Sequence, residues 1–165
     1  MPSALHLLYS TIWAALVLFV LAQHGQRRIS ARNPSTWVAW ANAIGVTLCA
    51  IHIVLAMASV HGWSHAAAAE AIASQTEAVY GLRWGGGMYV NYAFVLVWAL
   101  DAWLSRSPSH RLDAPSVRWA IRIFYAIVIF NAAVVFARGS MRVVGVALVA
   151  ALLLAWRKTP FHPSL

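Results

Sequence analysis

The sequence predicts an all-α fold, a polytopic integral membrane bundle of five transmembrane helices with one further helix at the extracytoplasmic interface. Two observations support this prediction. The 165-residue chain is 62% hydrophobic and only 10% charged, whereas soluble domains carry about 25% charged residues. The apolar residues are concentrated in five long stretches, and arginines flank those stretches mainly in alternate loops. We therefore expect residues 1–165 to form a single membrane domain.

Each of the five stretches is long enough to cross a bilayer as one helix. Crossing the hydrocarbon core takes roughly 20 apolar residues, and about 17 to 25 are tolerated. Lipid offers no hydrogen-bond partners to unpaired backbone groups, so open strands cannot cross it. The sequence therefore predicts transmembrane helices at residues 4–23, 36–60, 87–104, 118–137 and 141–157.

The basic residues predict the direction of these helices, because cytoplasmic loops carry an excess of positive charge. Nine of the twelve lie beside the ends that would face the cytoplasm if the N-terminus is outside, and three lie on the opposite side. We therefore expect an extracytoplasmic N-terminus, a cytoplasmic C-terminus and a bacterial inner membrane. The nine are Arg27, Arg28, Arg32, Arg106, Arg111, Arg118, Arg122, Arg157 and Lys158, and the three are Arg83, Arg138 and Arg142.

Tryptophan positions give an independent indication of the same topology. Amphipathic indole rings gather at the two membrane–water interfaces. Seven of the nine tryptophans fall at predicted span ends, and only Trp13 and Trp98 fall near mid-membrane. The cytoplasmic ends hold Trp37, Trp40, Trp103, Trp119 and Trp156, and the outer ends hold Trp63 and Trp84.

One face of the second span is predicted to point into the bundle. Its residues share a side at helical periodicity, and small side chains let membrane helices approach closely. The face consists of Ala41, Gly45, Cys49, His52, Ala56 and Ser59.

His52 on this face is the candidate cofactor-binding residue. We expect its imidazole to hydrogen-bond a neighbour such as Asn91, Tyr92 or Asn131. The alternatives are an axial haem ligand and a proton or quinone site. No second histidine is plainly level with His52 in the bilayer, so the pattern does not favour a haem held by two histidines.

The other polar residues within the spans have structural interpretations. Asp101 is the only acid within a span, and an unpaired carboxylate costs up to about 3 kcal/mol at the bilayer centre. Arg122 enters the next span at comparable depth, so a structural ion pair between the two is predicted. Asn42, Asn91 and Asn131 are expected to form hydrogen bonds between helices.

The only sizeable connection is the extracytoplasmic segment, residues 61–87. Ser64 is placed to cap a helix over residues 64–80, and Gly81 is placed to end it in a left-handed conformation. The helix is rich in alanine, which favours helix formation. We expect it to lie along the interface or to fold over the outer mouth of the bundle.

This segment also holds four candidate metal ligands, His61, His65, Glu70 and Glu77. Glu70 and Glu77 share a helix face, but His65 is predicted to lie on a different face of the same helix. A metal site would therefore need ligands from elsewhere, and a solvated face packed against a partner is the competing interpretation.

Three functions are compatible with these features. The favoured hypothesis is a non-catalytic or cofactor-holding subunit of a larger membrane complex, such as an electron-transfer assembly, that docks through residues 61–87 with Trp63, Tyr80 and Trp84. The second is a haem- or metal-binding redox protein that uses His52 and the outer histidines. The third is a small transporter or channel. The sequence shows neither a nucleophile–base pair for a hydrolase nor a soluble basic domain for nucleic acid.

Overall fold

The computed structural model is all α-helical and describes residues 2–26, 36–104 and 114–157. The predicted fold class is confirmed, because five of its helices are long and apolar enough to cross a membrane. The remaining α-helix is the short one that the sequence predicts at residues 64–80. The elements are α1 (Pro2–Gln26), α2 (Thr36–Ser59), α3 (His65–Tyr80), α4 (Gly87–Leu104), α5 (Pro115–Phe130), the π-helix η1 (Asn131–Val135) and α6 (Ser140–Arg157).

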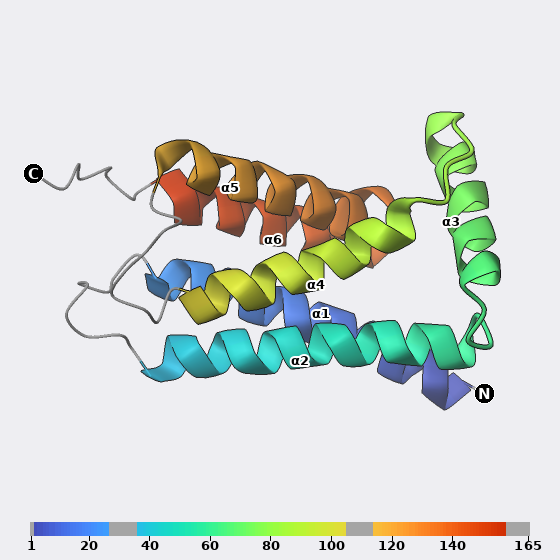
Figure 1. Cartoon of the computed structure of the whole chain (residues 1–165), viewed down its shortest axis with the longest axis horizontal. Coiled ribbons are helices and arrows are strands. Elements are labelled where there is room, and N and C mark those ends of the chain that lie inside the picture. The colour runs from blue at the N-terminus through green and yellow to red at the C-terminus, as the bar shows by residue number, and fades with distance from the viewer. Residues whose placement is uncertain (1, 27–35, 105–113, 158–165) are drawn as a thin grey trace, which may run out of the picture.

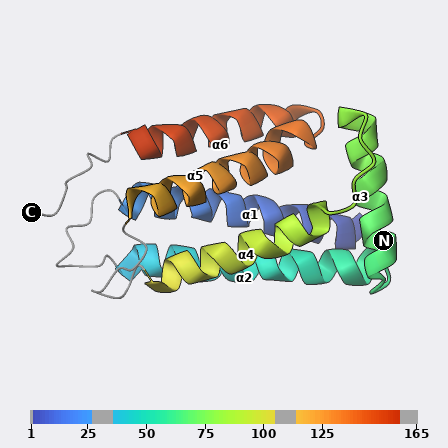
Figure 2. The ribbon, with the colours of Figure 1, turned by 45° about the horizontal axis from the view of Figure 1, so that its top comes forward.

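The five long helices lie side by side, and α3 lies across one end of them (Figures 1 and 2). Successive long helices run in alternating directions, so α1 begins at the α3 end and α6 finishes at the opposite end (Figure 1). The loops that hold Arg27, Arg28, Arg32, Arg106 and Arg111 lie outside the described residues, as does Lys158.

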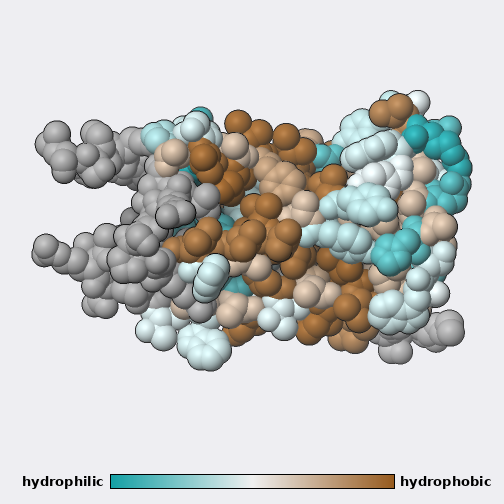
Figure 3. All heavy atoms as spheres, viewed as in Figure 1, coloured by the Kyte–Doolittle hydropathy of each residue, from teal (hydrophilic) through white to brown (hydrophobic). Residues whose placement is uncertain are grey.

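The outer surface of the bundle is apolar, as expected of helices that face lipid. Hydrophobic residues cover the middle of the helices, and hydrophilic residues gather over the α3 end (Figure 3). Large apolar side chains such as Leu96, Ile127 and Val143 are exposed along the sides. A soluble protein rarely exposes a continuous apolar patch of this extent, so the chain is a small multi-span membrane protein.

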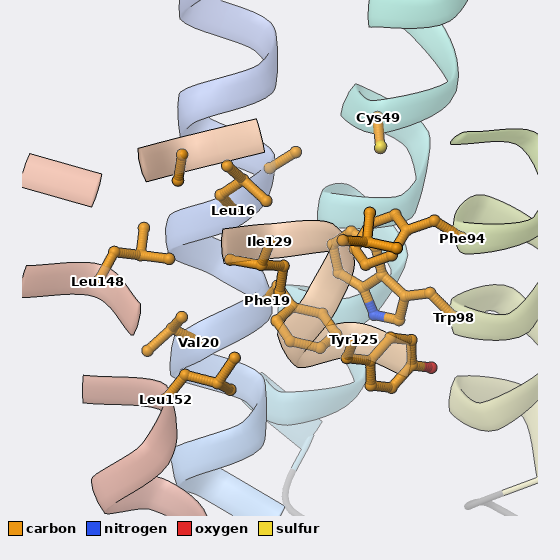
Figure 4. Close-up of a cluster of buried hydrophobic side chains, with 13 residues drawn as sticks. Leu16, Phe19, Val20, Cys49, Phe94, Trp98, Tyr125, Ile129, Leu148 and Leu152 are labelled. Atoms are coloured by element: carbon orange, nitrogen blue, oxygen red, sulfur yellow. The ribbon is translucent and has the colours of Figure 1, made fainter. Parts of the chain in front are cut away.

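The core of the bundle is an aromatic cluster at mid-length of the helices. Phe19 of α1 meets the rings of Trp98 and Tyr125 edge-on, with centroids 5.0 and 4.9 Å apart (Figure 4). Phe94 completes the cluster at 5.8 Å from Phe19. Edge-to-face pairs add roughly 0.5–1.5 kcal/mol beyond the area that they bury. Four aromatic rings therefore link α1, α4 and α5.

Trp98 also connects α4 to α2 through a polar contact. Its indole N–H donates to Asn42 Oδ1 at 2.9 Å, and the Asn42 amide in turn donates to the backbone oxygen of Val38 at 3.1 Å. Trp98 and Asn42 are both buried. The predicted role of Asn42 between helices is confirmed.

The small residues on α2 make room for this indole. Ala41, Gly45 and Cys49 are buried, as predicted, whereas Ser59 at the helix end is exposed. A Cβ on Gly45 would lie 2.5 Å from the Trp98 ring. This face of α2 therefore points into the bundle, where Trp98 of α4 fills the space that the small side chains leave.

A second close approach joins α6 to the end of the fourth span. The predicted span of residues 118–137 is not one continuous α-helix, because η1 follows α5, and the amide of Phe136 bonds the carbonyl of Asn131 at 2.9 Å. The carbonyl of Ala133 in η1 points at α6, and a Cβ on Gly145 would lie 1.7 Å from its oxygen. Only glycine fits there.

We predict that Gly145→Ala destabilises the bundle by about 1–3 kcal/mol, the usual cost of overpacking a core. At a helix position that faces no neighbour, the same change would increase stability by up to about 1 kcal/mol. The sign of the measured change therefore shows whether Gly145 is packed against η1. Unfolding in mixed micelles, followed by circular dichroism, measures the difference. Ala147→Val on an exposed position of α6 is the control and should change stability by less than about 0.5 kcal/mol.

Candidate functional site

A cavity of about 160 Å³ lies inside the bundle at the α3 end. Its wall combines α1, α2, α4, α5 and η1 with the inner side of α3, and it is mostly apolar. It is lined by Ile12, Leu16, Cys49, His52, Ile53, Ala56, Met57, His61, Ala68, Ile72, Met88, Asn91, Tyr92, Phe94, Val128, Ile129 and Ala132.

His52 is oriented in this wall by a backbone group of α1. Its Nδ1 lies 2.9 Å from the carbonyl oxygen of Leu8. A carbonyl oxygen only accepts hydrogen bonds, so in the neutral ring Nδ1 carries the proton and Nε2 keeps its lone pair. The partner is thus neither Asn91, Tyr92 nor Asn131, because the imidazole points across the close α1–α2 contact.

The cavity brings a second histidine to the same space. His61 follows the end of α2, where its amide bonds the carbonyl of Ala56 at 3.2 Å, and its side chain lines the cavity with His52. The sequence predicts His61 only as part of the segment 61–87 and gives no indication that it reaches the interior of the bundle. The turn that folds it back over the bundle depends on Gly62 and Trp63, both at positive φ, and glycine at position 62 was the available signal.

The outer helix α3 has the predicted ends. The Ser64 hydroxyl accepts a hydrogen bond from the amide of Ala67, and Gly81 ends the helix with φ 69°. Both capping predictions are confirmed. Beyond Gly81 the chain turns back, and Arg83 donates to Glu77 at 2.7 Å and also bonds Glu70. The hydrogen bond to Glu77, followed by the charge of Glu70, raises the pKa of Arg83 above its usual value.

The predicted metal ligands are not gathered at one point. Glu70 and Glu77 both bond the Arg83 guanidinium, and the His65 ring lies against Tyr92 with centroids 6.3 Å apart. Among the described residues, no group of three or more His, Cys, Asp or Glu side chains is placed to hold a metal ion. The metal prediction therefore gains no support from the geometry of this segment.

One further contact joins α3 to the bundle, and two others pack the connector between α3 and α4 onto α3. The Tyr80 hydroxyl bonds Asn131 Oδ1 on η1, which confirms a role for this asparagine between helices. The Thr76 hydroxyl lies 2.9 Å from the carbonyl oxygen of Trp84. Gly85 lies so close to α3 that a Cβ there would be 2.6 Å from the carbonyl oxygen of Ala69. The connector to α4 is thus packed on α3.

The predicted ion-pair residues sit at the opposite end of the bundle. Asp101 Oδ2 lies 3.5 Å from the Tyr125 hydroxyl, below the aromatic cluster. The Arg122 guanidinium lies 5.9 Å from the ring centroids of both Trp119 and Trp156, a distance typical of cation–π contacts. The ion pair between Asp101 and Arg122 stays a prediction.

These features define the class of the chain, a small multi-span membrane bundle with a surface helix across one end and a cavity beneath it. Comparison with protein-family models, curated proteins and solved structures finds no match to this chain.

We predict that Arg83→Met loosens the outer segment without unfolding the bundle. Exposed ion pairs contribute little to global stability, but this arginine is shared by two carboxylates on α3. Hydrogen exchange measured by mass spectrometry should show faster exchange across residues 65–87 and an unchanged rate in α1 and α2. Arg157→Met, at the end of α6, is the control and should leave exchange in α3 unchanged.

Proposed function

We propose that this chain is a non-catalytic subunit of a larger membrane complex and that it docks its partner through residues 61–87. The main support is that α3 is packed on the bundle, through Ala68 against Met57 and Met88 and through the hydrogen bond of Tyr80 to Asn131, while the large apolar side chains of residues 61–87 face outward. Trp63 and Leu82 are each 63% exposed, and Tyr80 and Trp84 are about half exposed. Tryptophan and tyrosine side chains are enriched among the residues that anchor protein interfaces.

The backbone at Trp63 supports a role for its exposed indole. Trp63 is the only non-glycine residue with positive φ among the described residues, at 61°. Left-handed backbone costs roughly 1–2 kcal/mol for a residue with a Cβ, and retained strain concentrates at functional sites. The Trp63 side chain is mostly exposed, so it gains little from packing within the chain to offset the backbone strain. A contact between this indole and another protein would explain why tryptophan, and not glycine, occupies the position.

The alternative functions have weaker support. The cavity beside His52 is smaller than the roughly 300–1,000 Å³ of typical ligand and cofactor pockets, which disfavours a haem. The rings of Phe19, Phe94, Trp98 and Tyr125 fill the bundle at mid-length, which disfavours a transport pathway along its axis. A cofactor-holding role is favoured by one observation alone, the orientation of His52 toward the cavity.

The proposal includes the orientation in which the α3 end is extracytoplasmic, with the N-terminus outside and the C-terminus inside. Its support is the excess of arginine in the first and third loops and at the C-terminal end. We predict that alkaline phosphatase fused to the C-terminus is inactive and that green fluorescent protein fused there is fluorescent. A cysteine introduced near the other end, Ser3→Cys, should react with a membrane-impermeant maleimide added from outside. The same location for both ends, whether inside or outside, would contradict an odd number of crossings.

We predict that Trp63→Ala combined with Trp84→Ala releases the chain from its complex. Each exposed anchor is expected to contribute at least about 2 kcal/mol to binding, so native-gel migration after mild solubilisation should shift from a larger species to the free chain. Trp37→Ala combined with Trp40→Ala removes two exposed indoles from the other end of α2 and is the control. Unchanged migration of the first variant would refute docking through this segment.

We predict that Trp63→Gly separates docking from folding. Glycine adopts positive φ without the steric cost of a Cβ, so this variant should unfold at the same temperature as the unaltered chain or a higher one. It should nevertheless lose the partner. A drop in unfolding temperature together with a retained complex would show that Trp63 serves the fold instead.

A further inference from the structure

The cavity beneath α3 has no part in the docking surface formed by residues 61–87. We propose that it binds a small neutral ligand with one aromatic ring and one hydroxyl, a phenol-type group, and that His52 Nε2 accepts the hydroxyl hydrogen bond. The fixed tautomer of His52, the size of the cavity and the apolar nature of its wall favour such a ligand.

His52 presents an acceptor to the cavity. Because Nδ1–H is engaged by the Leu8 carbonyl, Nε2 is the free lone pair of the neutral ring. Within the described part of the chain Nε2 has no hydrogen-bond partner. His52 is half-buried, and an acceptor left without a partner away from water costs up to roughly 1–3 kcal/mol, so a ligand that carries one donor recovers part of this cost, whereas a ligand without a donor does not.

The volume and wall of the cavity select the rest of the ligand. About 160 Å³ is close to the roughly 150 Å³ of an engineered apolar cavity that binds benzene. Met57 and Met88 are buried in the wall, and thioether sulfur makes favourable contacts with aromatic rings. A single six-membered ring fits this space.

The cavity has a side that faces the membrane. Asn91 and Ala132 line the cavity and are also exposed on the outer surface, so the wall between α4 and η1 is thin. The η1 segment departs from regular α-helix at this point, and such π-helical turns are frequent at functional sites. A phenol head can therefore arrive as a free molecule or at the end of a membrane-dissolved chain.

The experiment compares phenol with benzene on the full chain in lipid nanodiscs, with histidine labelled by ¹⁵N. Empty nanodiscs correct for partitioning into lipid. Before ligand is added, His52 Nε2 should show the resonance of an unprotonated nitrogen. Phenol should shift this resonance saturably and bind about tenfold more tightly than benzene, the ratio expected for one recovered hydrogen bond.

Two variants test the role of His52. His52→Leu should reduce phenol affinity to that of benzene, whereas His6→Leu, at an exposed position of α1, should keep the tenfold preference. Equal affinity for phenol and benzene in the unaltered chain would overturn the proposal, as would a protonated Nε2 or a preference retained in His52→Leu. The first two results require no variant to fold.

A final comparison distinguishes the sources of the ligand. Hydroquinone and decyl-hydroquinone carry the same hydroxyl donor, and only the second carries a membrane-soluble tail. Tighter binding of the tailed form, after correction for partitioning, would assign the ligand to the lipid phase. Equal affinity would assign it to a free phenol.

Discussion

The structure depends on one interaction above all, the insertion of the Trp98 indole between α2 and the aromatic rings of α1 and α5. A ring of this size is accommodated only because position 45 has no side chain. Its single N–H would be unsatisfied in lipid-like surroundings if Asn42 did not accept from it, because unpaired polar groups are costly there. Two residues of α2, Gly45 and Asn42, therefore provide the space and the hydrogen-bond acceptor that the Trp98 indole of α4 requires.

The two ends of the molecule are stabilised by different kinds of contact. At one end, the Trp156 N–H donates to Gln23 at 3.0 Å between α6 and α1, and Arg122 lies between two indoles. At the other end, α3 is held by an arginine shared between two carboxylates and by side-chain hydrogen bonds. Water is available to charged groups only outside the hydrocarbon region, so this ionic cluster belongs at a surface.

The cavity and the outer helix are consequences of the same geometry. Because α3 crosses the bundle end, its inner residues Ala68 and Ile72 close a space that the long helices leave open. The turn after α2 places His61 in that space. Aromatic side chains on either side of α3, Trp63 and Trp84, remain exposed, so residues 61–87 both close the cavity and present an aromatic surface.

The sequence predicted the helices closely because their signals are local. Hydropathy placed all five long helices, and Ser64 and Gly81 marked the ends of α3 through backbone chemistry within a few residues. The π-helix after Phe130 was missed, because the composition of residues 131–135 does not distinguish it from α-helix, and its close contact with Gly145 exists only in the folded bundle. The small-residue face of α2 was recognised from periodicity, but its occupant, Trp98, was not.

By itself the sequence determined that this chain forms helices in a membrane, since apolar length and the number of charges decide the free energy of transfer into lipid. Only the tertiary structure decided what each polar side chain contacts. The Leu8 carbonyl that orients His52 is 44 positions away in the chain, and a backbone oxygen has no signature in a sequence. Likewise the joining of His52, His61 and Asn91 around one cavity depends on which helices are neighbours, and every helix in an apolar bundle offers similar surfaces to its neighbours.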